Sequence, residues 1–101
     1  MKTKPINAHE FVFGKNFTDH MLSVDWNKDG GWKRPQIIPY GPLKIPVSAS
    51  SLQYGISCFE GLNVVKNRES KMFQPFRVDK HMGHLLESSS HIDLPLFDPA
   101  Q

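Results

Sequence analysis

The chain has 101 residues, a formal net charge of +2 and a single cysteine, so it can form one modest domain at most. Its basic residues are scattered, which argues against a nucleic-acid surface, and no apolar run is long enough to span a bilayer. The first residues lack the apolar core of a signal peptide and the arginine-rich pattern of a transit peptide.

The N-terminal half of the chain predicts a β-hairpin. The residues of one set, Leu22, Val24 and Trp26, alternate with Met21, Ser23 and Asp25, which is the period of a half-buried strand. Residues 27–31 read Asn-Lys-Asp-Gly-Gly, a turn whose glycines can adopt positive φ. The second arm, residues 36–38, lies between two prolines and is therefore expected to be a short or edge strand.

The middle of the chain predicts a short extended piece, a short helix and a second hairpin. Residues 44–47 form the extended piece. Ser50 or Ser51 is expected to cap a short helix that ends at Gly61 and carries Tyr54 and Phe59 on one wall. Residues 62–65 and 72–73 are expected to pair across a polar tip, residues 66–70.

A longer helix is predicted from about Asp79, a plausible cap, to Ile92, with one apolar arc packed against the sheet. The arc consists of Val78, Met82, Leu85, Leu86, Ser89 and Ile92. The whole chain is therefore expected to be an α+β unit, with a small mixed sheet, hairpins and two packed helices.

The titratable side chains do not predict a metal site or a reactive thiol. His81, His84 and His91 lie near one edge of the long helix, but no cysteine or paired carboxylate completes a ligand set with them. Cys58 has no basic neighbour in the sequence, so we expect a small buried residue there. One cysteine cannot form an internal disulfide, which suits a reducing compartment.

Three sequence blocks carry a family resemblance. In residues 13–26 the run Phe-Thr-Asp-His-Met is followed by a Trp; in residues 54–62 a Tyr precedes Phe-Glu-Gly-Leu; in residues 71–98 Lys-Met-Phe-Gln-Pro leads into a helix before Leu-Pro-Leu-Phe-Asp. In this order the blocks resemble the N-terminal small domain of branched-chain amino acid aminotransferases, of the eukaryotic type in particular. The resemblance covers residues 13–98, nearly the whole chain.

The resemblance implies a fold-type IV, pyridoxal phosphate-dependent transferase of amino-acid metabolism. Its substrates would be Leu, Ile or Val with 2-oxoglutarate, its full-length form a homodimer, and its location the cytoplasm, with mitochondria left open. Residues 1–12 would be an N-terminal extension and residues 13–101 an incomplete small domain. No stretch resembles the family's large domain with its cofactor-binding lysine, so we expect a truncated chain that is inactive alone.

The resemblance also implies site residues. Phe13, Tyr54 and Phe59 match family aromatics that line the branched side-chain pocket. His84 stands where the family has an Arg that grips the cofactor phosphate, and an imidazole offers fewer donors and less charge, so phosphate affinity should fall. Arg77 or Lys80 are alternative phosphate donors. No catalytic residue is expected in this chain.

Two other functions remain open from the sequence. The chain could be a non-catalytic binding or dimerisation module that docks on a full-length partner. The parent protein could also be another fold-type IV enzyme, such as a D-amino acid aminotransferase or an aminodeoxychorismate lyase, although the block at residues 17–26 argues for the branched-chain group.

Overall fold

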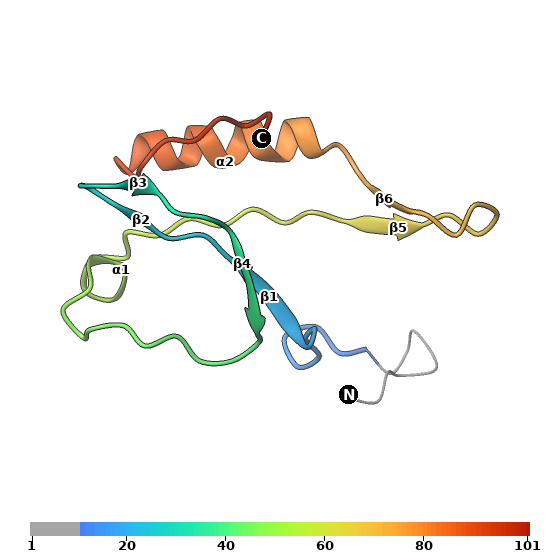
Figure 1. Cartoon of the computed structure of the whole chain (residues 1–101), viewed down its shortest axis with the longest axis horizontal. Coiled ribbons are helices and arrows are strands. Elements are labelled where there is room, and N and C mark those ends of the chain that lie inside the picture. The colour runs from blue at the N-terminus through green and yellow to red at the C-terminus, as the bar shows by residue number, and fades with distance from the viewer. Residues whose placement is uncertain (1–10) are drawn as a thin grey trace. The chain divides into compact units, whose positions relative to one another are not determined.

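The computed structural model describes residues 11–101, which form two compact units (Figure 1). The first unit ends at Lys44 and the second is Ile45–Gln101. The first unit contains β1 (His20–Ser23), β2 (Trp26–Asn27), β3 (Gly31–Trp32) and β4 (Gln36–Pro39). The second contains α1 (Ser50–Gln53), β5 (Val64–Lys66), β6 (Phe73–Pro75) and α2 (Val78–His91).

The first unit is the predicted hairpin. β1 pairs antiparallel with β4, and β2 pairs antiparallel with β3 nearer the turn. Between the two ladders, the backbone N–H of Lys33 donates to the carbonyl of Asp25 at 2.7 Å. At the turn, the Asn27 side-chain oxygen accepts the Gly30 N–H at 2.7 Å, and Gly31 has φ +66°. The Asn-Lys-Asp-Gly-Gly turn is therefore confirmed, and Gly31 adopts the positive φ that the sequence predicts for a glycine of this turn.

The second hairpin is also confirmed, with small shifts at its ends. β5 and β6 pair antiparallel with Val65 opposite Gln74. The Asn67 side-chain oxygen accepts the N–H groups of Glu69 and Ser70 at 2.9 and 3.0 Å, which closes the polar tip. The Lys66 ammonium lies 5.5 Å from the centre of the Phe73 ring across the pair.

The prediction for the short helix is wrong in its length and its cap. α1 ends at Gln53, and its N-cap is Ala49, whose side chain makes no capping hydrogen bond. The chain leaves the helix at Gly55, which has φ +67°, so this glycine and not Gly61 ends the helical path. Tyr54 and Phe59 consequently do not share a helix.

The long helix is confirmed within one residue at each end, but its cap is not Asp79. The N-cap is Arg77, in the left-handed region at φ 53°, and Asp79 lies inside the first turn, where a carboxylate favours the helix dipole. At the other end Asp93 has φ 58°, and the N–H groups of Asp93 and Leu94 donate to the carbonyls of Ser90 and Ser89. This pair of bonds is a Schellman motif, and Pro95 then prevents the helix from continuing.

The α+β class is confirmed, whereas a single mixed sheet is not formed. In the described residues the strands make three separate two-stranded sheets, and every pairing is antiparallel. The strands have only two to four residues, and prolines at 35, 39 and 75 remove N–H donors that a further strand would need. Residues 44–47 lie in no strand.

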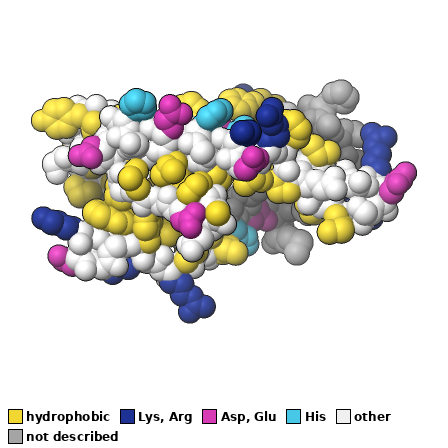
Figure 2. All heavy atoms as spheres, turned by 90° about the horizontal axis from the view of Figure 1, so that it is seen from above, with side chains coloured by type: hydrophobic (Ala, Val, Ile, Leu, Met, Phe, Trp, Pro, Cys, Tyr) yellow, Lys and Arg dark blue, Asp and Glu magenta, His cyan; other side chains and the backbone are white. Residues whose placement is uncertain are grey.

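The described residues enclose no apolar core. Of residues 11–101, Ser89 is buried at 5% exposure, and no hydrophobic side chain is buried with it. The predicted arc of α2 is the best covered part, since Met82, Leu85, Leu86 and Ile92 are half-buried. Figure 2 shows hydrophobic side chains at many places on the face that it presents. Within the described chain, no helix has the length and apolar character needed to cross a membrane.

Candidate functional site

The three predicted pocket aromatics are among the most exposed large hydrophobic side chains of residues 11–101. Phe13 is 105% exposed on a turn of the first unit, and Tyr54 and Phe59 are 80% and 92% exposed in the second. Tyr54 is the C-cap of α1, and Phe59 lies in the connection from α1 to β5. Each ring is therefore exposed within its own unit. Their role in substrate binding stays a prediction.

The connection that carries Phe59 runs alongside α2 (Figure 1). Over residues 56–60 the exposure alternates: Ile56, Cys58 and Glu60 are half-buried, and the residues between them are exposed. The Ser57 N–H donates to the Gly55 carbonyl at 2.8 Å, so the chain makes a tight turn at Ile56. From Cys58 to Glu60 the alternation is that of extended backbone, in which successive side chains point to opposite sides. One side of this segment therefore faces α2, and Phe59 projects from the other side.

Glu60 and His81 form a side-chain contact between this segment and α2. A Glu60 carboxylate oxygen lies 2.7 Å from Nδ1 of His81, and the two side chains are 21% and 26% exposed. A carboxylate only accepts, so Nδ1 of His81 carries the donated proton. Glu60 is thus a half-buried partner of the long helix.

A second contact joins the same segment to α2 farther along the helix. The Cys58 sulfur lies 3.6 Å from the Ser89 hydroxyl oxygen, and that hydroxyl donates to the Leu85 carbonyl at 2.8 Å. Because the hydroxyl proton is already engaged, Ser89 accepts from the Cys58 thiol. Cys58 is half-buried against the helix, close to the small packed residue that the sequence predicted.

His84 lies exposed on α2, one turn after His81. Lys80, four residues before His84, is exposed as well, so the two side chains project from the same face of the helix. Arg77 is the N-cap and lies outside the helical turns. The helix therefore presents an ammonium and an imidazole together, a pair of donors suited to an anion.

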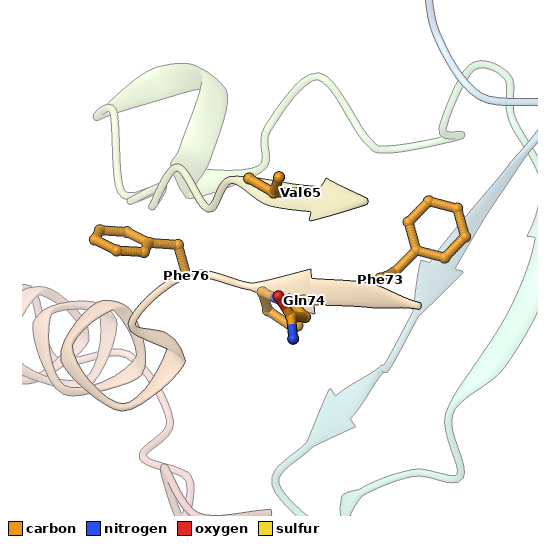
Figure 3. A pocket seen from close by; sticks show the side chains of 5 residues that line it. Val65, Phe73, Gln74 and Phe76 are labelled. Carbon is orange, nitrogen blue, oxygen red and sulfur yellow. The ribbon is translucent and has the colours of Figure 1, made fainter. Parts of the chain in front are cut away.

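A shallow hollow of about 510 Å³ lies beside β5 and β6, and none of the predicted site residues lines it. It is lined by Val65, Phe73, Gln74, Pro75 and Phe76. Figure 3 shows Phe73 and Phe76 at opposite ends of β6, with Val65 on the neighbouring strand. Most of its lining is apolar, and one amide is its polar group, so it offers no acid, base or nucleophile.

No metal centre is formed by the part of the chain that the structure describes, since no group of three or more histidine, cysteine or carboxylate side chains gathers there. His81, His84 and His91 do not act as one group, because His81 forms a hydrogen bond with Glu60. Sequence reasoning missed this engagement. The two residues are 21 positions apart, and no local pattern links them.

Comparison with known proteins finds clear relatives. No family model matches the chain. The chain is 45% identical over 89 residues to a branched-chain-amino-acid aminotransferase of Dictyostelium discoideum. It is 41% identical over 98 residues to the cytosolic enzyme of Mus musculus and 40% over 91 residues to the mitochondrial enzyme of Schizosaccharomyces pombe. These matches cover 88%, 97% and 88% of this chain but only 23%, 25% and 21% of the relatives.

Proposed function

We propose that this chain, which is related in sequence to branched-chain-amino-acid aminotransferases, is part of such an enzyme and contributes to its substrate pocket. The observation that carries the proposal is the extent of the similarity: identity of 40% or more runs through at least 88% of the chain in these three relatives. The reaction would move an amino group between Leu, Ile or Val and 2-oxoglutarate.

The exposed apolar side chains support a role within a larger protein. The chain spans only a fifth to a quarter of the length of these relatives, and residues 11–101 bury no hydrophobic side chain. Rings such as Phe13 and Phe59, left in water, forgo most of the stabilisation that their burial would provide. We propose that further polypeptide of a fold-type IV enzyme covers them, with a second subunit completing a homodimer.

The pocket roles follow from the chemistry of the exposed rings. An aliphatic side chain such as that of leucine is selected by apolar walls, which Phe13 and Phe59 would supply. Tyr54 adds a hydroxyl to an apolar ring, so it could also donate to the carboxylate of the amino acid or the 2-oxo acid. None of these residues would take part in bond breaking.

Pyridoxal phosphate would be the cofactor, and the donors on α2 fit its phosphate. Lys80 and His84 share one exposed helix face and would hold the anion through an ammonium and an imidazole. An Arg at position 84 would bind it more firmly through a forked pair of hydrogen bonds. When bound, the cofactor supplies the electron sink for amino transfer. This chain would supply only contacts to it.

The relatives' names include both cytosolic and mitochondrial enzymes. We propose the cytoplasm for this protein, as for the cytosolic relative of Mus musculus.

A hybrid enzyme tests the proposal. Residues 1–101 would replace the matching segment of the Dictyostelium discoideum relative, and the purified hybrid would be assayed with leucine and 2-oxoglutarate. We expect transamination of leucine, isoleucine and valine and little reaction with D-alanine. A folded, cofactor-loaded hybrid that prefers D-alanine would favour the D-amino acid class, and one without either activity would refute a pocket role.

A further inference from the structure

The segment at residues 56–60 is attached to α2 at two points, Glu60 on His81 and Cys58 on Ser89. We propose that the Glu60–His81 pair is a positioning pair: it fixes this segment on α2 so that the Phe59 ring projects from the opposite side, toward the substrate side chain. The substrate in this inference rests on the proposed function, whereas the attachment rests on the contacts themselves.

The first support is the direction of the side chains. Glu60 is 21% exposed and Phe59 is 92% exposed, although they are adjacent in the chain. In extended backbone, neighbouring side chains point to opposite sides, so turning residue 60 toward the helix turns residue 59 away from it. The orientation of the ring is therefore set by its neighbour, because an exposed ring has few contacts of its own to fix it.

The second support is the relative strength of the two attachments. The 2.7 Å contact joins a carboxylate to an imidazole, and hydrogen bonds with an ionised partner are about twice as strong as neutral ones. The 3.6 Å contact joins a thiol to a hydroxyl, a weak donor on a neutral acceptor. Loss of the Glu60–His81 pair should thus free the end of the segment next to Phe59.

The third support is the direction in which the segment runs along α2. Cys58 meets the later residue, Ser89, and Glu60 meets the earlier one, His81, so the segment runs antiparallel to α2. The two contacts fix both its direction and its register along the helix. A wall residue must be held within about 0.5 Å of its working position by such supporting contacts, and Phe59 lies between them in sequence.

Backbone ¹⁵N relaxation on the full 101-residue chain tests the attachment. We expect the amide of Phe59 to have an order parameter near that of rigid backbone, about 0.85, and to fall below about 0.6 in Glu60→Ala and in His81→Leu. Glu60→Gln keeps an acceptor and His81→Asn keeps a donor at the position of Nδ1, so both should restore the rigid value. Glu87→Ala, which removes an exposed carboxylate from α2, is the matched control and should change nothing.

General destabilisation is separated from positioning by the amides of residues 85–87 in α2. Positioning predicts that they keep their order parameters in Glu60→Ala, whereas general loss of structure would lower them together with Phe59. A wild-type Phe59 amide that is already flexible, or one that stays rigid in both disruptive variants, would overturn the proposal.

The hybrid enzyme adds a second readout. Glu60→Ala should raise KM for leucine roughly tenfold with little change in kcat, because the ring contributes binding that is equal in ground and transition states. Glu60→Gln should restore KM. An equal loss in kcat with KM unchanged would refute the positioning role, and an inactive wild-type hybrid would refute the proposed function while the relaxation measurement still decides the attachment.

Discussion

The rings of Phe17 and Tyr40 stack with their centroids 4.7 Å apart and their planes 12° from parallel. Phe17 precedes β1 and Tyr40 follows β4, and the Tyr40 N–H donates to the Asp19 carbonyl at 2.9 Å. The aromatic pair therefore closes the open end of the first hairpin, at the point farthest from its turn.

Removing one ring of this pair should loosen the hairpin. An aromatic pair contributes about 0.5–1.5 kcal/mol beyond its buried area, so Phe17→Ala should lower the ratio of paired to open hairpin between about twofold and about twelvefold. Cross-strand proton contacts between β1 and β4 in NMR spectra measure that ratio. Tyr40→Phe, which keeps the ring, should leave it unchanged, and so should Phe13→Ala, which removes an exposed ring four residues before Phe17 in the sequence. Equal effects of Phe13→Ala and Phe17→Ala would show that the stack contributes nothing specific.

Asp93 should be replaceable by glycine with a gain in helix stability. The residue holds φ 58° in the Schellman motif that ends α2, a conformation that costs an L side chain more than glycine. We expect Asp93→Gly to stabilise the helix by about 0.5–1 kcal/mol and Asp93→Val to destabilise it.

Circular dichroism at the helical band during urea unfolding measures the stability of α2 in the parent chain, in Asp93→Gly and in Asp93→Val. Asp93→Asn is the control for charge, since it removes the carboxylate from the helix C-terminus and still tolerates the left-handed region. A gain in Asp93→Asn as large as in Asp93→Gly would mean that the carboxylate, and not the backbone angle, limits the helix.

The isolated chain should self-associate. Residues 11–101 bury no hydrophobic side chain, and contiguous exposed apolar surface drives association in water. We expect the sedimentation coefficient and the midpoint of thermal unfolding to rise with protein concentration. A clean monomer with a sharp, concentration-independent transition would contradict this expectation.

Two variants of the hybrid enzyme should fail in different ways. Phe59→Ala removes an apolar wall and should weaken the preference for branched side chains over alanine. Tyr54→Phe keeps the ring and removes one hydroxyl, and loss of a donor to a carboxylate costs about 1.5–3 kcal/mol of binding. Its KM for 2-oxoglutarate or for the amino acid should therefore rise. Steady-state kinetics with leucine and alanine separates the two, and identical kinetic changes in both variants would remove their assignment to different roles.

His84→Arg should tighten cofactor retention in the same hybrid. A guanidinium presents a fixed fork of N–H donors to the phosphate, whereas the imidazole provides at most one donor toward it. The fraction of pyridoxal phosphate that remains after prolonged dialysis, measured by absorbance, reports the change. His91→Arg adds the same charge farther along α2 and is the matched control. Equal retention in the parent hybrid and in His84→Arg would show that position 84 does not meet the phosphate.

Sequence patterns predicted the elements whose causes are local. The turn at residues 27–31, the polar tip after β5 and the extent of α2 are predicted correctly. Their causes are hydrophobic periodicity, glycine backbone freedom and side-chain hydrogen bonds to backbone groups a few residues away, all of which can be recognised in a short stretch of sequence. Three short sequence blocks likewise predict the resemblance to branched-chain-amino-acid aminotransferases. The relatives confirm this resemblance over at least 88% of the chain.

Tertiary structure decided the features that depend on partners far apart in the chain. The sequence predicts that α1 reaches Gly61, but the chain leaves the helix at Gly55, and Cys58 and Glu60 contact α2 instead. Four residues of helix gain too little from their own hydrogen bonds to compete with contacts to a longer helix. The Glu60–His81 pair that results spans 21 positions, a separation at which a single sequence has no periodicity to reveal a contact.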